Sequence, residues 1–114
     1  MAGVVQIPWY ATVLRGDRFE KALELIAPVA LRYGATDFRV YRAHGDRYKF
    51  TQMATFEDHL DFERYWYGDE FSAWRSDFSS WYQVPVVYDW ADLVISGGLG
   101  SDPEALAGFP GHSV

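Results

Sequence analysis

The segment from Glu63 to Pro85, with the sequence ERYWYGDEFSAWRSDFSSWYQVP, decides the fold class. From Glu70 to Tyr82 its aromatic rings fall on one arc of a helix with 3.6 residues per turn, and its serines fall on the opposite arc. Gly68 and Asp69 separate this part from a preceding helix, which the pattern predicts over 56–67. We therefore predict a broken amphipathic helix that lies with its aromatic face on an apolar layer.

The first strand of that layer is predicted over Val5–Arg15, VQIPWYATVLR. Apolar residues alternate there, with Trp9 on one face and Tyr10 on the other, as in a strand with one buried face. Pro8 indicates an edge position or a bulge, because proline has no N–H to donate to a sheet. Gly16 ends the strand.

A first helix is predicted to follow and to run to Tyr33. Asp17 and Glu20 have the spacing of a capping box at its start. Pro28 is expected to bend this helix without ending it, and Gly34 is expected to stop it.

Two more strands, DFRVYRA (37–43) and RYKFTQMATF (47–56), are predicted to form a hairpin around His44, Gly45 and Asp46. Thr55, three residues before Asp58, is expected to cap the second helix. The run VVYDWADLVI (86–95) predicts a last strand. The order βαββαβ is that of an α+β, ferredoxin-like fold, in which two helices cover one face of a four-stranded antiparallel sheet.

The opposite face of the sheet is expected to be too apolar to remain in water. We assign to it Tyr10, Leu14, Tyr41, Val86 and either Tyr88 or Trp90, depending on the strand register. A second copy of the chain is its natural cover, so we expect a homodimer. The domain is predicted over residues 1–96, followed by a Gly/Pro-rich tail over residues 97–114.

The bulk composition limits the partners. Sixteen acidic against ten basic residues give a formal net charge of −6, which disfavours nucleic acid and anionic membrane partners. The sequence has no cysteine, which rules out disulfides and thiolate chemistry within it. Neither a signal peptide nor a membrane span is recognisable, so we expect a cytoplasmic protein.

Three stretches carry a resemblance to the antibiotic-biosynthesis-monooxygenase-like group of the dimeric α/β-barrel superfamily. They are VVQIPWYATVLR (4–15), FTQMATFEDHLDF (50–62) and YGDEFSAWRS (67–76), and the resemblance covers about residues 4–96. It implies a homodimer with a ligand cavity between each sheet and its helices. It also implies activities that range from oxidation of aromatic polyketides without metal or flavin to haem degradation.

The resemblance carries over only in part to individual residues. The haem-degrading members use an Asn and a late helical His, and the cofactor-free oxygenases use an Asn with a Trp. This sequence contains no Asn, so haem degradation is disfavoured, and Trp66 or Trp74 is the counterpart of the Trp.

The candidate catalytic residues are His59, Glu63 and Arg75. His59 and Glu63 are four residues apart on one helix face, where a carboxylate can orient an imidazole that acts as a base. Arg75 can hold the carboxylate or phenolate of a ligand. A surface ion pair is the alternative interpretation in both cases.

The candidate substrate-binding residues offer ring faces and polar tips to a planar molecule. They are Tyr10, Tyr41, Trp66, Trp74 and Tyr82. Packing of a core is the alternative explanation of the same rings. We expect no metal, since one His and one Glu supply at most two ligands at this site, and we expect no cofactor.

Two functions are consistent with these residues. One is a small cofactor-independent enzyme, monooxygenase- or cyclase-like, that acts on an aromatic or polyketide-type molecule. The other is a non-catalytic dimeric module that binds a ligand or a partner.

Overall fold

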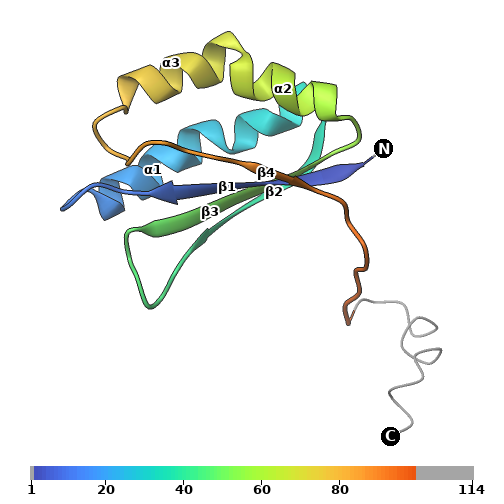
Figure 1. The fold of residues 1–114 in the computed structure, drawn as a ribbon, viewed down its shortest axis with the longest axis horizontal. Coiled ribbons are helices and arrows are strands. Elements are labelled where there is room, and N and C mark those ends of the chain that lie inside the picture. Colours follow the sequence, from blue (N-terminus) through green and yellow to red (C-terminus); the bar gives the residue numbers. More distant parts are fainter. Residues whose placement is uncertain (1, 100–114) are drawn as a thin grey trace, which may run out of the picture.

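The computed structural model describes residues 2–99, and these form a four-stranded antiparallel sheet covered on one face by helices (Figure 1). The strands are β1 (Gly3–Tyr10), β2 (Ala35–Arg42), β3 (Lys49–Phe56) and β4 (Asp89–Ala91), in the spatial order β2-β3-β1-β4. The helices are α1 (Gly16–Ile26), the 3-10 helix η1 (Pro28–Tyr33), α2 (His59–Tyr67) and α3 (Asp69–Asp77). The predicted α+β, ferredoxin-like arrangement is confirmed. The predicted tail lies outside the described residues from residue 100 onward.

Strand β1 is internal and pairs with β3 without a register shift, so neither the edge position nor the bulge predicted at Pro8 is present. Proline is tolerated there because β4 pairs only with Val4, Val5 and Gln6. Beyond Gln6, the side of β1 that faces β4 has no strand partner until an isolated bridge joins Ala11 to Tyr82. The missing N–H of Pro8 therefore removes nothing from that pairing.

The first helix differs from its prediction at both ends. Helix α1 stops at Ile26, and the chain from Pro28 continues as η1 instead of as a bent α-helix. Arg15 is the N-cap residue and makes no side-chain capping bond, so the predicted capping box is wrong. The carboxylates of Asp17 and Glu20 instead accept hydrogen bonds from Arg42 on β2, at 2.8 and 3.3 Å. A guanidinium from another element outcompetes the local backbone for these groups.

The connections also depart from the predicted turns. The loop between β2 and β3, residues 43–48, is longer than a two-residue turn, and Asp46 Oδ1 accepts the N–H of Tyr48 within it. Thr55 lies inside β3 and does not cap α2. Asp58 is the actual N-cap, and its carboxylate accepts the N–H of Leu60 at 3.0 Å.

Helix α3 ends at Asp77, five residues before the predicted end at Tyr82. Trp81 and Gln83 instead make backbone hydrogen bonds with Thr12 and Tyr10, and these bonds hold the segment beside β1. The last strand is reduced to Asp89–Ala91.

Val86 packs against the buried cluster, and both Tyr88 and Trp90 lie beneath the helices, so the assignment of Val86 and of one of these two rings to the open face is wrong. The rings of Tyr88 and Trp90 pack on Phe62 and so cover the apolar face of α2. Gly3 makes this possible, because a Cβ at that position would lie 2.3 Å from the indole of Trp90.

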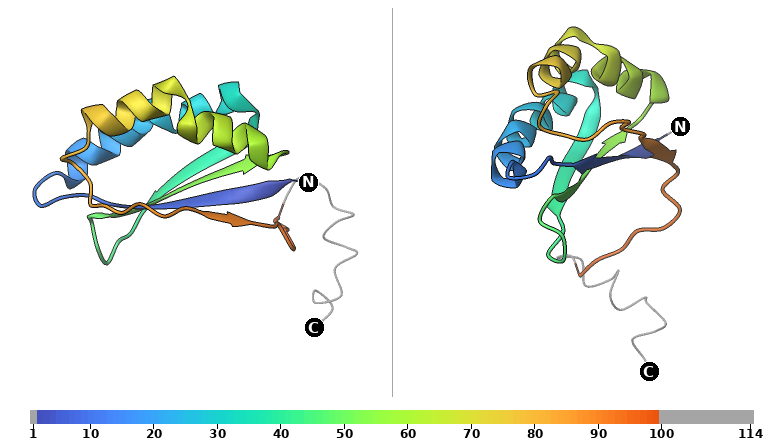
Figure 2. Two further views of the ribbon diagram at one scale, coloured as in Figure 1. Left: turned by 45° about the horizontal axis from the view of Figure 1, so that its top comes forward. Right: turned by 60° about the vertical axis from the view of Figure 1, so that its left-hand side comes forward.

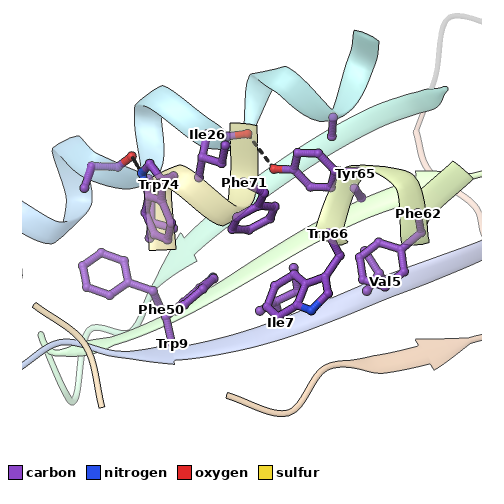
Figure 3. Close-up of a cluster of buried hydrophobic side chains, with 14 of the residues drawn as sticks. Val5, Ile7, Trp9, Ile26, Phe50, Phe62, Tyr65, Trp66, Phe71 and Trp74 are labelled. Carbon is purple, nitrogen blue, oxygen red and sulfur yellow. Dashed lines mark hydrogen bonds between the residues drawn. The ribbon is translucent and has the colours of Figure 1, made fainter. Parts of the chain in front are cut away.

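Aromatic rings fill the layer between the sheet and the helices (Figure 3). Trp9 lies among them, with its ring centroid 5.0 Å from Tyr82, 5.3 Å from Trp74 and 5.7 Å from Phe19. Rings packed edge to face at such distances stabilise a core beyond the area they bury. The rings predicted to lie on one face of the broken helix therefore pack with Trp9 in a continuous core.

The open face of the sheet lies opposite the helices (Figure 2). The strand registers place on it alternate residues of each strand, among them Val4, Gln6, Pro8, Tyr10, Arg39, Tyr41, Thr51 and Met53. Apolar and charged side chains are mixed there, which makes the face less apolar than expected. The segment after β4 leaves the sheet on this side (Figures 1 and 2).

Candidate functional site

Arg75 of α3 is the most unusual polar group in the described structure. Its guanidinium carbon lies 4.2 Å above the ring of Trp66 and 4.9 Å from that of Phe71, which are cation–π distances. Its Nη1 atom is buried and has no hydrogen-bond partner among the described residues. Burial lowers the pKa of the Arg75 guanidinium, because the charge has lost part of its water shell. An unsatisfied buried donor is costly, so an acceptor that reaches it gains more than at an exposed site.

His59 and Glu63 form the predicted pair on α2. Nδ1 of His59 lies 3.0 Å from Oε1 of Glu63, and each side chain is 42% exposed. The imidazole also meets the ring of Trp90 edge-on, with centroids 4.7 Å apart. The carboxylate can therefore hold one ring nitrogen while Nε2 remains available to a ligand at the surface.

A row of rings connects this pair to Arg75, and we call it the β4 seam. It consists of Phe62 and Trp66 on α2 with Tyr88 and Trp90 on the segment that leads into and through β4. Tyr88 lies 4.7 Å from Phe62 and 5.5 Å from Trp66, and Trp90 lies 6.2 Å from Phe62. His59 stands at one end of the seam and Arg75 at the other.

His59 and Arg75, at the two ends of the β4 seam, are too far apart to contact the same atom of a ligand. His59 precedes Trp66 by about two helical turns, a rise of roughly 10 Å. Arg75 lies over Trp66. A single small functional group cannot contact both ends, whereas an extended flat molecule along the seam can.

The other predicted substrate-binding rings do not join the β4 seam. Trp74 and Tyr82 are buried and stack on each other at 6.2 Å, and the indole of Trp74 donates to the carbonyl of Ala22 at 2.8 Å (Figure 3). Tyr10 and Tyr41 are 40% and 51% exposed on the open face of the sheet. Of the five, Trp66 alone belongs to the seam, whereas the hydroxyl of Tyr82 donates to the backbone carbonyl of Arg75 at 3.1 Å.

Gln52 is a buried polar residue that the sequence analysis did not single out. Its amide oxygen accepts the indole N–H of Trp9 at 3.0 Å, and its amide nitrogen donates to the hydroxyl of Tyr65 at 3.0 Å. That hydroxyl donates in turn to the carbonyl of Ile26, which ends α1 (Figure 3). The only sequence signal was a Gln at an inward position of an otherwise apolar strand face.

The part of the chain that the structure describes contains no candidate metal site. Within residues 2–99, no three His, Asp or Glu side chains are grouped as metal ligands would be. In the same range, every helix is too short or too polar to cross a bilayer.

The fold is shared with solved structures of the antibiotic-biosynthesis-monooxygenase-like group. A candidate antibiotic biosynthesis monooxygenase from Nitrosomonas europaea superposes with a TM-score of 0.74 at 14% identity, over 85% of this chain and 94% of that chain. SnoaB, a cofactor-independent oxygenase from Streptomyces nogalater, has a TM-score of 0.72 at 12% identity, over 83% of this chain and 95% of its own. A protein of unknown function from Nitrosomonas europaea, NE2512, has a TM-score of 0.71 at 14% identity, with coverages of 89% and 98%.

Sequence comparison adds nothing to this result, since no family model and no curated protein matches the chain. At identities of 12–14% the likeness concerns the fold. The predicted fold group is thus confirmed, and this group contains both a cofactor-independent oxygenase and a protein of unknown function.

Proposed function

We propose that this chain is a small cofactor-independent oxygenase that acts on an aromatic or polyketide-type molecule bearing an anionic oxygen. The observation that carries the proposal is the buried Nη1 atom of Arg75, which has no hydrogen-bond partner among the described residues and belongs to a guanidinium stacked on Trp66. A phenolate or enolate oxygen would satisfy this donor while the attached ring lies against the indole. The fold shared with SnoaB supports the reaction type.

Each end of the β4 seam has a role in this proposal. Arg75 stabilises the oxyanion that develops when the substrate loses a proton. His59, held by Glu63, takes that proton from the far end of a fused ring system. Dioxygen then oxidises the substrate anion, so that a ring CH2 becomes a carbonyl and the second oxygen atom leaves as water. This stoichiometry needs no external reductant.

The substrate must displace Tyr88, whose ring lies against Trp66 in this structure. After the backbone bond of Gln83 to Tyr10, residues 84–88 form no helix or strand, and β4 pairs with only three residues of β1. Few backbone hydrogen bonds therefore oppose its displacement. Tyr10, Tyr41, Trp74 and Tyr82 remain candidate binding residues, although they lie away from the β4 seam.

The test is oxygen uptake with an anthrone such as dithranol, which has an acidic CH2 and phenolic oxygens. We expect Arg75→Gln to lower kcat by about 100-fold, the usual effect of losing one oxyanion donor. His59→Ala should lower it by at least about 100-fold with the fold intact. Arg64→Gln is the matched control, because Arg64 is exposed and, among the described residues, forms an ion pair only with Asp61. Unchanged turnover in Arg75→Gln would contradict the proposal.

We also propose that two copies pair through the open face of the sheet. Tyr41, Met53 and Val4 supply apolar contacts on this face, and Leu93 of the departing segment closes one side of a groove of about 350 Å³ there. Sedimentation equilibrium should give a dimer for the natural sequence and a monomer for Met53→Arg. A natural chain that sediments as a monomer would refute the pairing.

The second candidate function is a non-catalytic dimeric module that binds a ligand or a partner. The specific observation in its favour is the packed interior, where rings occupy the layer between the sheet and the helices. Native mass spectrometry of protein purified from its own source distinguishes the two. A retained ligand that the protein leaves unaltered in air supports the module, whereas its oxidation supports the enzyme.

A further inference from the structure

A groove lies between α1 and the edge strand β2, away from the β4 seam. It has a volume of about 370 Å³, within the range of small-molecule sites. Its floor is apolar and consists of Leu23, Ala27, Phe38, Val40 and Phe50. The rim carries Glu20, Glu24 and Arg42.

The groove exists because of the way in which α1 ends. The α-helix stops at Ile26, and η1 turns over the beginning of β2. The later part of β2 is left without a helix above it. Val40 is therefore 36% exposed although it points to the helical side of the sheet, opposite the buried Gln52. Exposed apolar surface next to a concave site is typical of ligand binding.

The rim of the groove is negative despite Arg42. The guanidinium of Arg42 already donates to Asp17, to Glu20 and to the carbonyl of Arg47, the last at 2.7 Å. Its hydrogen bond to Asp17, more than any other contact, raises its pKa, so it stays charged and engaged. Two carboxylates, Glu20 and Glu24, against one guanidinium leave the rim with a formal charge of −1, and Asp17, outside the groove, also pairs with Arg42. An anion would meet net repulsion there.

We infer that this groove binds a small amphiphilic amine, with its alkyl or aryl part on the apolar floor and its ammonium group at Glu24. Glu24 is exposed and has no ion-pair partner among the described residues, so its carboxylate is available. The ammonium group completes the charge balance that Arg42 leaves incomplete. This site is independent of the proposed oxygenase chemistry.

The experiment is a titration of the full chain with n-butyl-, n-hexyl- and n-octylammonium chloride, followed by amide chemical shifts. We expect shifts around Ala27 and Val40. The affinity should rise by up to about four-fold for each methylene that the floor covers. Hexanoate and hexanol, tested at the same ionic strength, should bind more weakly than hexylammonium.

Variants locate the site. Glu24→Gln should weaken hexylammonium binding by about two- to five-fold, the range of one partly exposed ion pair. Val40→Lys should abolish binding, because it fills the floor and adds a like charge. Glu57→Gln, an exposed glutamate outside the groove, and Arg75→Gln should change nothing.

Several results of these titrations would overturn the inference. They are hexanoate binding as tightly as hexylammonium, shifts confined to other parts of the chain, and an affinity that does not depend on Glu24. Binding only of a basic peptide, with new hydrogen-exchange protection along β2, would also overturn it and would assign this edge to strand pairing.

Discussion

The hydroxyl of Tyr65 connects two parts of the core, and its removal should be costly. In Tyr65→Phe the ring stays in place but two buried groups lose their partner. These are the amide nitrogen of Gln52, at 3.0 Å, and the carbonyl of Ile26. The backbone N–H of Ala30, which would bond that carbonyl in a continued α-helix, bonds Ala27 instead.

The expected magnitude follows from those two groups. Each unsatisfied buried group costs about 1–3 kcal/mol, so we expect the two together to lower the free energy of unfolding by about 2–6 kcal/mol. Domains of this size are stable by about 5–15 kcal/mol. The loss should therefore lower the Tm by roughly 8–24 °C, at about 4 °C per kcal/mol.

Urea unfolding followed by circular dichroism measures this loss, at two protein concentrations so that any subunit dissociation is recognised. Tyr33→Phe is the matched control, because its hydroxyl meets Glu70 at 3.2 Å on the exposed surface. We expect no measurable change in that variant. If Tyr65→Phe unfolds at the same urea concentration as Tyr33→Phe, the buried chain of hydrogen bonds does not stabilise the fold as argued.

Three further predictions concern pH, the helix break and a helix cap. Burial raises the pKa of Tyr65, so the folded state keeps a proton that the unfolded state releases above about pH 10. The contribution of Tyr65 to stability is complete below that pH and is lost as the pH rises towards the folded pKa. Urea titrations should thus show a steeper alkaline loss in the natural sequence than in Tyr65→Phe, by up to about 1.4 kcal/mol per pH unit, and equal slopes would refute this. Gly68→Ala should destabilise the fold by about 1–3 kcal/mol, because its Cβ would lie 2.4 Å from the carbonyl oxygen of Arg64. Gly45→Ala, where the Cβ meets nothing within 4 Å, is the thermal-melting control, and an equal Tm for the two variants would contradict the clash. Asp58→Ala should cost about 1 kcal/mol by removing the cap on Leu60, and an unchanged urea midpoint would show that this cap is dispensable.

The order of helices and strands was predictable from the sequence, because the spacing of apolar residues in each element depends only on residues that are close together in the chain. The alternation around Trp9 and the ring arc of α3 both survive in the folded chain. The ends of the elements were harder to predict, because contacts between distant residues determine them. Arg42 binds the carboxylates expected to cap α1, and Tyr10 and Thr12 hold the segment expected to continue α3.

The candidate site was predictable only where sequence spacing places residues together. The His59 and Glu63 pair follows from one turn of helix and is present at 3.0 Å. The position of Arg75 above Trp66 depends on the break at Gly68, where α2 ends and α3 begins. Tyr10 and Tyr41 alternate to the far side of the sheet, which periodicity shows once the strand register is known.

The ring centroid of Trp9 lies 6.1 Å from that of Trp66 and 5.3 Å from that of Trp74. These three indoles therefore provide an intrinsic spectroscopic signal for changes in the core. Indole transitions at such separations couple and give an intense near-ultraviolet dichroism that depends on the angle between the rings. A substrate that pushes Tyr88 off Trp66 will alter that signal without any label, whereas an amine in the groove beside β2 will leave it untouched.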